Sequence, residues 1–209
     1  MGVEVSIELL RPGFYPAGGG RIHVSITPAA RLVRLDLEQR GEIVSRHGRA
    51  VVANLAYTIA QREARHAAEV LEWSPDSVDA HTLTGSTGPG NAVSVFVGAE
   101  NVTNVFTTFG ARGVTAEKVA HDVALQAKRY INSGAAVDEH LADQLLLPLA
   151  VGAGGCFTTT PLSLHATTNI EVIRQFVDVS IDVQVISNGV TRVMVEPVIR
   201  GFQPQNGVN

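Results

Sequence analysis

The chain has 209 residues, of which 45% are hydrophobic and 17% are charged, a composition that excludes an intrinsically disordered protein. Its formal net charge of −4 argues against a protein that holds long nucleic acid through the phosphates, because such proteins carry a basic surplus, so any contact with nucleic acid is expected at a strand end. No apolar run reaches the ~18 residues that span a bilayer, and no signal peptide is visible. The single cysteine excludes an internal disulfide. We therefore expect a cytoplasmic protein with no membrane contact.

The first forty residues show three strand patterns and a glycine-rich loop. Apolar and polar residues alternate in segments 3–9 and 22–26, which is the period of a half-buried strand, and a third strand is expected near 32–37. The loop between the first two is dense in glycine and proline. Its Gly18–Gly20 run offers bare N–H groups to a phosphate. No Gly-Lys-Ser/Thr follows and a strand comes next, so a tight turn is the better interpretation.

From about residue 41 to residue 136 the pattern is that of a small α+β unit. The expected elements are short strands at 43–45 and 50–52, a helix at 55–71, a loop at 85–91, strands at 92–97 and 102–109, and a helix at 115–131. Thr115 is the expected N-cap of the last helix, and Gly134 is expected to end it.

The segment from about 137 to 197 has a third pattern. The expected elements are an apolar helix at 138–150, a strand at 156–160, a helix at 168–176, and strands at 179–186 and 190–195. The last two flank Asn188-Gly189, the strongest short signal of a β-hairpin. Residues 200–209 are expected to form a loose tail.

A few polar residues in this last segment are candidates for chemistry. His165 stands between the expected strand and helix, among hydroxyl and amide side chains, and a neutral imidazole is a competent nucleophile towards phosphorus. Because the chain has seven histidines, an ordinary capping or loop role is the stronger interpretation from the residues alone. Asp143 and Gln144 interrupt an apolar helix, so they either face solvent or serve a site.

Other residues favour structural roles. Cys156 has no nearby base in the sequence and is expected to be a small core residue. Phe14 and Tyr15 are able to stack a base, but aromatic residues in loops more often hold the loop to the core. Gly88–Asn91 is expected to be a turn, and no Cys/His cluster has the spacing of zinc ligands.

Five stretches, in this order, resemble the RNA 3′-terminal phosphate cyclase family. They are Gly13–Gly20, Gly88–Asn91, Leu141–Leu145, His165 with Thr168-Asn169, and Asn188–Val193. The likeness covers residues 1–197. The first, third and fourth stretches are specific together, whereas any one alone is weak.

The resemblance implies an α/β fold in which a large domain of repeated βαβαββ units carries a smaller inserted α/β domain. Residues 1–40 and 137–197 are then expected to be large-domain segments, with residues 41–136 as the insert and 198–209 as a tail. The second large-domain segment carries the histidine that matches the family's nucleophile.

The resemblance also implies a reaction. The family activates an RNA 3′-phosphate with ATP: the histidine matching His165 attacks the α-phosphate through Nε2, pyrophosphate leaves, and AMP passes to the RNA end, where the 2′-hydroxyl closes a 2′,3′-cyclic phosphate. ATP and a divalent cation, Mg²⁺ or Mn²⁺, are implied. The implied nucleotide-binding residues are His140, Leu141, Ala142, Asp143 and Gln144.

The sequence departs from the family in two respects. His140 stands where a tyrosine packs against adenine in the family, and an imidazole offers less area for stacking. The family's N-terminal region, with its Gly-Glu-Gly-Gly-Gly run and its metal- and phosphate-holding residues, is missing. These departures leave three alternatives. The first is the cyclase enzyme, or a half of it that needs a separately encoded N-terminal polypeptide. The second is a non-catalytic relative in RNA processing or ribosome assembly, and the third is a truncated, inactive remnant. The presence of His165 argues against the second.

Overall fold

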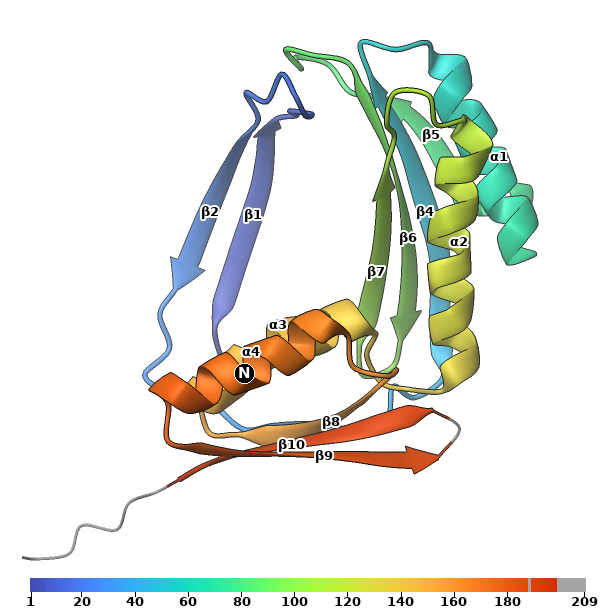
Figure 1. Cartoon of the computed structure of the whole chain (residues 1–209). Coiled ribbons are helices and arrows are strands. Elements are labelled where there is room, and N and C mark those ends of the chain that lie inside the picture. The colour runs from blue at the N-terminus through green and yellow to red at the C-terminus, as the bar shows by residue number, and fades with distance from the viewer. Residues whose placement is uncertain (188, 199–209) are drawn as a thin grey trace, which may run out of the picture.

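The structure is a computed structural model, and it describes residues 1–187 and 189–198 (Figure 1). In chain order its elements are β1 (Glu4–Arg11), β2 (Arg21–Thr27), β3 (Leu35–Leu37), β4 (Ile43–Ala53), α1 (Tyr57–Leu71), a short 3₁₀ helix (Pro75–Ser77), β5 (Val78–Thr82), β6 (Gly90–Ala99), β7 (Thr103–Phe109), α2 (Ala116–Ser133), α3 (Glu139–Val151), β8 (Gly155–Thr159), α4 (Leu164–Phe176), β9 (Val179–Ser187) and β10 (Val190–Pro197). The mixed α/β class expected from the sequence is confirmed.

The strands form three separate sheets. Among the described residues, strands β1 and β2 pair only with each other, the second sheet has the order β3-β8-β10-β9, and the third has the order β5-β4-β6-β7. Helices α3 and α4 cover one face of the second sheet, and α1 and α2 cover one face of the third (Figure 1). Each helix pair closes its own hydrophobic core, one formed within residues 50–130 and the other by Leu37 together with residues between 136 and 195.

Helix α2 forms where local signals predict it. The Thr115 hydroxyl accepts a hydrogen bond from the Lys118 N–H at 3.2 Å, and Gly134 ends the helix with a left-handed φ of 74°. Its apolar stripe, including Val123 and Tyr130, is buried against the third sheet. Cap, stripe and terminating glycine agree, so this element is specified by its own residues.

Other elements differ from expectation. Instead of two short strands, β4 is a single strand of 11 residues, and its centre is polar because Ser45, His47 and Arg49 are exposed. When a sheet is covered on one face, its other face is open to solvent and tolerates such polar residues. The short strand β5 was not predicted, and α4 begins at Leu164 rather than at Thr168.

The chain leaves the second sheet after β3 and returns to it beside the same strand. Leu37 pairs in parallel with Phe157 of β8, and Val137 forms a parallel bridge with Thr159. The Thr158 hydroxyl donates to the Glu38 carbonyl at 2.7 Å and accepts from the Ala136 N–H at 3.0 Å. One side chain therefore joins the point of departure to the point of return.

The glycine-rich loop forms the tip of the β1–β2 hairpin. Gly18 and Gly19 have positive φ angles of 63° and 75°, so the interpretation as a tight turn is confirmed. The Thr87 hydroxyl donates to the Gly18 carbonyl at 2.9 Å, and the Phe14 ring lies so close to Gly90 that a Cβ there would overlap it. Phe14 thus holds the loop to its neighbour, whereas Tyr15 is 96% exposed.

The sequence also predicts a turn at Asn188-Gly189 and a loose tail at 200–209. Asn188 and the whole tail lie outside the described residues. Within the described residues, no helix has the length and apolarity needed to cross a membrane.

Candidate functional site

His165 lies in the first turn of α4, with its side chain exposed. Ser163 caps the helix, because its hydroxyl accepts a hydrogen bond from the Ala166 N–H at 3.2 Å. The expectation that His165 precedes the helix was wrong by one turn, since this serine starts the helix before the histidine. The imidazole consequently stands at the end of α4 where unpaired N–H groups and the helix dipole favour an anion.

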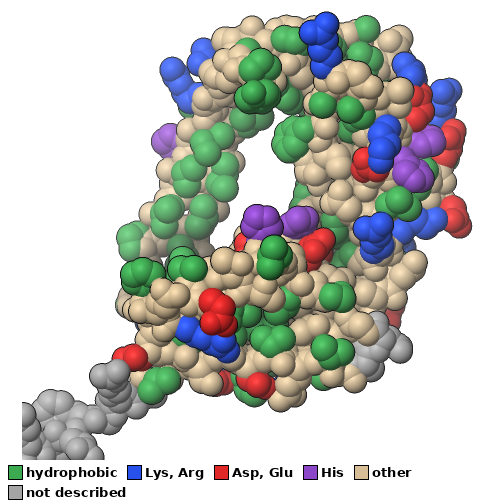
Figure 2. Space-filling view, viewed as in Figure 1, with side chains coloured by type: hydrophobic (Ala, Val, Ile, Leu, Met, Phe, Trp, Pro, Cys, Tyr) green, Lys and Arg blue, Asp and Glu red, His purple; other side chains and the backbone are tan. Residues whose placement is uncertain are grey.

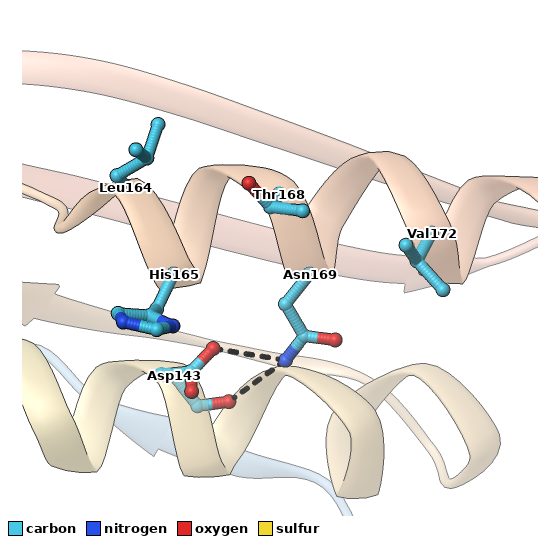
Figure 3. A pocket seen from close by; sticks show the side chains of 6 residues that line it. All are labelled: Asp143, Leu164, His165, Thr168, Asn169 and Val172. Carbon is cyan, nitrogen blue, oxygen red and sulfur yellow. Dashed lines mark hydrogen bonds between the residues drawn. The ribbon is translucent and has the colours of Figure 1, made fainter.

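An open pocket of about 500 Å³ lies beside the imidazole. Figure 3 shows the residues that line it, Asp143 from α3 and Leu164, His165, Thr168, Asn169 and Val172 from α4. The two helices are brought together by their buried residues, among them Ala142, Leu146 and Ile170, which pack above the second sheet. The pocket is therefore a consequence of helix packing and joins Asp143 to residues that follow it by 21 to 29 positions in the sequence.

Asp143 is fixed by Asn169. The Asn169 side-chain amide donates to Asp143 Oδ1 at 3.0 Å and to the Asp143 carbonyl at 3.3 Å. Figure 3 shows the His165 ring and the Asp143 carboxyl group extending towards each other from facing helices. The carboxyl group and the imidazole therefore border the same pocket.

The other residues of the expected nucleotide-binding set lie elsewhere on α3. His140, Asp143 and Gln144 share one face of the helix by their i, i+3, i+4 spacing, and His140 and Gln144 are exposed. Ala142 is buried in the core, and Leu141 packs against it. Of the five, only Asp143 shares a pocket with His165.

His140 lines a second pocket, of about 350 Å³, between α2 and the beginning of α3. The other residues around it include Arg129, Tyr130, Asp138 and Thr160. The expected set is therefore divided between two neighbouring hollows, with the exposed Gln144 lining neither.

Sequence reasoning missed the part played by Asn169. Asn169 belongs to a stretch that resembles the family, but the sequence alone indicates no role for its side chain. Its position four residues after His165 places both on one helix face, and that signal was available once Ser163 was recognised as the cap.

Cys156 and metal ligands offer no alternative centre. Cys156 is buried, and burial, together with hydrogen bonds to Glu38 and Asp36, raises the pKa of its thiol to about 11. It is therefore a protonated core residue at neutral pH, as expected. Among residues 1–187 and 189–198, no group of three His, Cys, Asp or Glu side chains is placed to hold a metal ion.

Comparison with known proteins gives the family. The model of the RNA 3′-terminal phosphate cyclase family matches residues 1–183. Proteins named RNA 3′-terminal phosphate cyclase are 45% identical over 183 residues in Koribacter versatilis (88% of this chain, 52% of the relative), 49% over 185 residues in Ralstonia nicotianae (88% and 53%), and 42% over 195 residues in Pseudomonas aeruginosa (93% and 57%). The chain spans about half the length of the relatives it matches. With most of its residues covered by the family model and nearly half of them identical in these relatives, the chain belongs to the RNA 3′-terminal phosphate cyclase family.

Proposed function

We propose that this chain supplies the nucleophile of an ATP-dependent RNA 3′-terminal phosphate cyclase. In the first step, Nε2 of His165 attacks the α-phosphorus of ATP, an N–P bond forms, and the bond to pyrophosphate breaks. AMP then passes from the histidine to an RNA 3′-phosphate. The 2′-hydroxyl attacks that activated phosphate, AMP leaves, and a 2′,3′-cyclic phosphate remains.

One observation supports this proposal above the others: the His165 imidazole is exposed in an open pocket and faces a carboxylate that is fixed in place. A nucleophile must reach phosphorus in line with the leaving group, so a ring enclosed in the core would be incompatible with the reaction. A partner carboxylate stabilises the positive charge that the ring acquires as its nitrogen bonds to phosphorus.

The neighbouring residues have proposed roles in holding ATP. The first turn of α4 presents N–H groups to the phosphates. The exposed His140, in the adjoining hollow, is placed to stack on the adenine, and the exposed Gln144 offers hydrogen bonds on the same face of α3. Leu141 and Ala142 serve by packing this helix against the core.

A divalent cation, Mg²⁺ or Mn²⁺, remains part of the proposal for the complete enzyme, although no group of three His, Cys, Asp or Glu side chains gathers among the described residues. We therefore assign no step of the reaction to a metal held by this chain. The chain covers about half the length of its relatives, and we propose that the complete activity also requires the remaining family length.

The test is adenylylation with α-³²P-ATP, using this chain together with the part of the Ralstonia nicotianae relative outside the matched region. We expect His165→Ala to abolish the label, and the wild-type label to be lost in acid, as an N–P bond requires. His81→Ala is the matched control, because His81 is an exposed histidine on β5, and it is expected to label as wild type. Equal labelling of the two variants would remove His165 from the mechanism.

A further inference from the structure

A buried asparagine joins the third sheet to the start of α3. Asn104 lies in β7 and is 1% exposed, and both polar atoms of its side chain are bonded. Its amide nitrogen donates to the Tyr130 hydroxyl at 2.7 Å and to the Ala136 carbonyl at 3.3 Å. Its Oδ1 accepts a hydrogen bond from the Asp138 N–H at 3.1 Å. Asp138 is the N-cap of α3, so the Asn104 side chain reaches from β7 to the point where this helix begins.

Tyr130, near the end of α2, belongs to the same hydrogen-bond network. Its side chain is buried, and its hydroxyl donates to the Ala136 carbonyl at 3.0 Å. The Arg40 guanidinium lies over the Tyr130 ring, 5.1 Å from its centre, and donates to the Tyr130 and Ile131 carbonyls at 3.0 Å and 2.8 Å. The chain enters the unit of residues 41–136 after Arg40 and leaves it at Ala136, so one tyrosine holds both connections. A buried polar network whose members are all paired is rigid.

The segment that leads into α3 is fixed to the second sheet as well. The Ala136 N–H donates to the Thr158 hydroxyl, and the Val137 N–H donates to the Thr158 carbonyl, each at 3.0 Å. The Thr159 hydroxyl donates to the Asp138 carbonyl at 3.3 Å. The start of α3 is therefore held from two sides, by β8 of the second sheet and by a side chain from β7 of the third.

This network also forms part of the hollow that contains His140. Tyr130, Asp138 and His140 line that hollow together, and His140 lies in the first turn of α3, two residues after the cap. Helices α3 and α4 carry the exposed His140 and His165, and Figure 2 shows histidine side chains on the surface where these helices border the opening through the molecule. A displacement of the first turn of α3 would therefore move His140 away from the rest of the hollow.

We infer that Asn104 is a positioning residue for ATP. It acts through Asp138, and it fixes the first turn of α3, and with it His140, in the position that receives the nucleotide. The inference rests on the proposed function, in which His140 stacks on the adenine. Asp143 lies one turn further along α3 and is held by its own hydrogen bond from Asn169. Loss of the Asn104 side chain therefore weakens the binding of ATP and leaves the rate at saturating ATP unchanged.

The kinetic test is adenylylation over a range of ATP concentrations, with the same two polypeptides as in the test of His165→Ala. We expect Asn104→Ala to raise the KM for ATP at least tenfold and to leave the maximal rate within twofold of wild type. Val93→Ala shortens a fully buried residue in β6, an inner strand of the third sheet, and is the control for a general loss of stability. This control is expected to lower the melting temperature, as Asn104→Ala does, and to keep the wild-type KM. An unchanged KM in Asn104→Ala, or an equal rise in both variants, would overturn the inference.

Amide hydrogen exchange in the full chain tests the same positioning without ATP. We expect Asn104→Ala to speed exchange at residues 138–142 at least tenfold and to leave exchange at residues 170–173 of α4 unchanged. Tyr130→Phe keeps the ring in the core and removes only the hydroxyl, so its effect at residues 138–142 is expected to lie between those of wild type and Asn104→Ala. Unchanged exchange at 138–142 in Asn104→Ala contradicts the inference. Equal labelling of wild type and His165→Ala would instead contradict the proposed function, and the exchange rates would still decide whether Asn104 holds the helix.

Discussion

Asn169 is the residue that turns a surface carboxylate into part of a site. Its amide holds both the side chain and the carbonyl of Asp143, so it fixes the carboxylate against the helix that carries His165. An exposed aspartate without this partner samples several rotamers, and its charge is then spread over a larger volume. Asn169 matters because a carboxylate held in one position stabilises a nearby developing charge more than a mobile carboxylate does.

We expect Asn169→Ala to slow adenylylation of His165 about tenfold while leaving the fold intact. A hydrogen bond to a charged group contributes roughly 1.5–3 kcal/mol, part of which is lost from the stabilisation of the imidazole. The measurement is the initial rate of labelling in the reconstituted complex. Thr167→Ala is the control, since its hydroxyl bonds only within the first turn of α4. A rate equal to that of the control would show that Asp143 needs no anchor.

Glu63 is a buried carboxyl group in α1, far from the site in sequence. Asn91 donates a hydrogen bond to its Oε1, and Oε2 has no partner within the described residues. Burial raises the pKa of Glu63 to about 7. The hydrogen bond from Asn91 and the charge of Arg62 lower this pKa in part, whereas the charge of Glu117 raises it further. The folded state therefore holds this proton more tightly than the unfolded state does.

The sign of the pH effect follows from that shift. Protonated Glu63 contributes at most about 3 kcal/mol to the free energy of unfolding. This contribution is complete below the ordinary pKa of about 4.5 and is lost as pH rises through about 7. Glu63→Gln mimics the protonated form. We expect the free energy of unfolding in urea to change less between pH 5 and pH 8 in this variant than in wild type. Glu69→Gln, at an exposed position of the same helix, is expected to show the pH dependence of wild type. The same pH dependence of stability in wild type and Glu63→Gln would mean that another group is responsible for it.

Among the elements, the contact between the hairpin tip and the start of β6 depends on two glycines. A Cβ at Gly90 would overlap the Phe14 ring, and one at Gly88 would overlap the Ala17 side chain. Two of the stretches that resemble the family are therefore packed against each other. The absence of a side chain at Gly88 and Gly90 is explained by the Ala17 and Phe14 side chains that lie against them.

We expect Gly90→Ala to destabilise the chain by about 1–3 kcal/mol, because the added methyl group displaces Phe14. The added cost should nearly vanish in a Phe14→Ala background, where the space is open, so the two substitutions are strongly non-additive. Thermal unfolding of the four proteins in the cycle measures this. Additive effects would mean that the tip does not rest on Phe14.

Elements with local signals were predictable from the sequence. Helix α2 was placed correctly because Thr115, its apolar stripe and Gly134 all lie within one segment. Strand β4 was divided in two because polar residues of an open sheet face interrupt its apolar pattern. Asp143 and His165 were each implied as site residues only by the resemblance, and the pocket that they share arises where α3 packs against α4. The Asn169 contact, which depends on the same packing and on an unrecognised cap at Ser163, was missed.

At the scale of the whole molecule, the site is open. The His165 pocket takes its described walls from α3 and α4 alone, so few groups are available to hold a triphosphate. We expect the isolated chain to bind ATP at least tenfold more weakly than the complex with the remaining family length, because ligand affinity depends on preorganised surroundings. Calorimetric titration of both samples gives the comparison. Equal affinities would show that the chain holds ATP with its own residues.

The place where the chain leaves and re-enters the second sheet has a consequence for how such a protein is put together. Leu37 faces Phe157, and Val137 faces Thr159, two positions further along the same edge of β8. The opposite edge of β8 is taken by β10, so residues 37 and 137 follow the course of a single strand with one position between them. The 99 intervening residues therefore leave and re-enter the same edge of β8 at neighbouring positions. We expect a gene that joins residue 37 to residue 137 through one linking codon to encode an uninterrupted strand along this edge of β8.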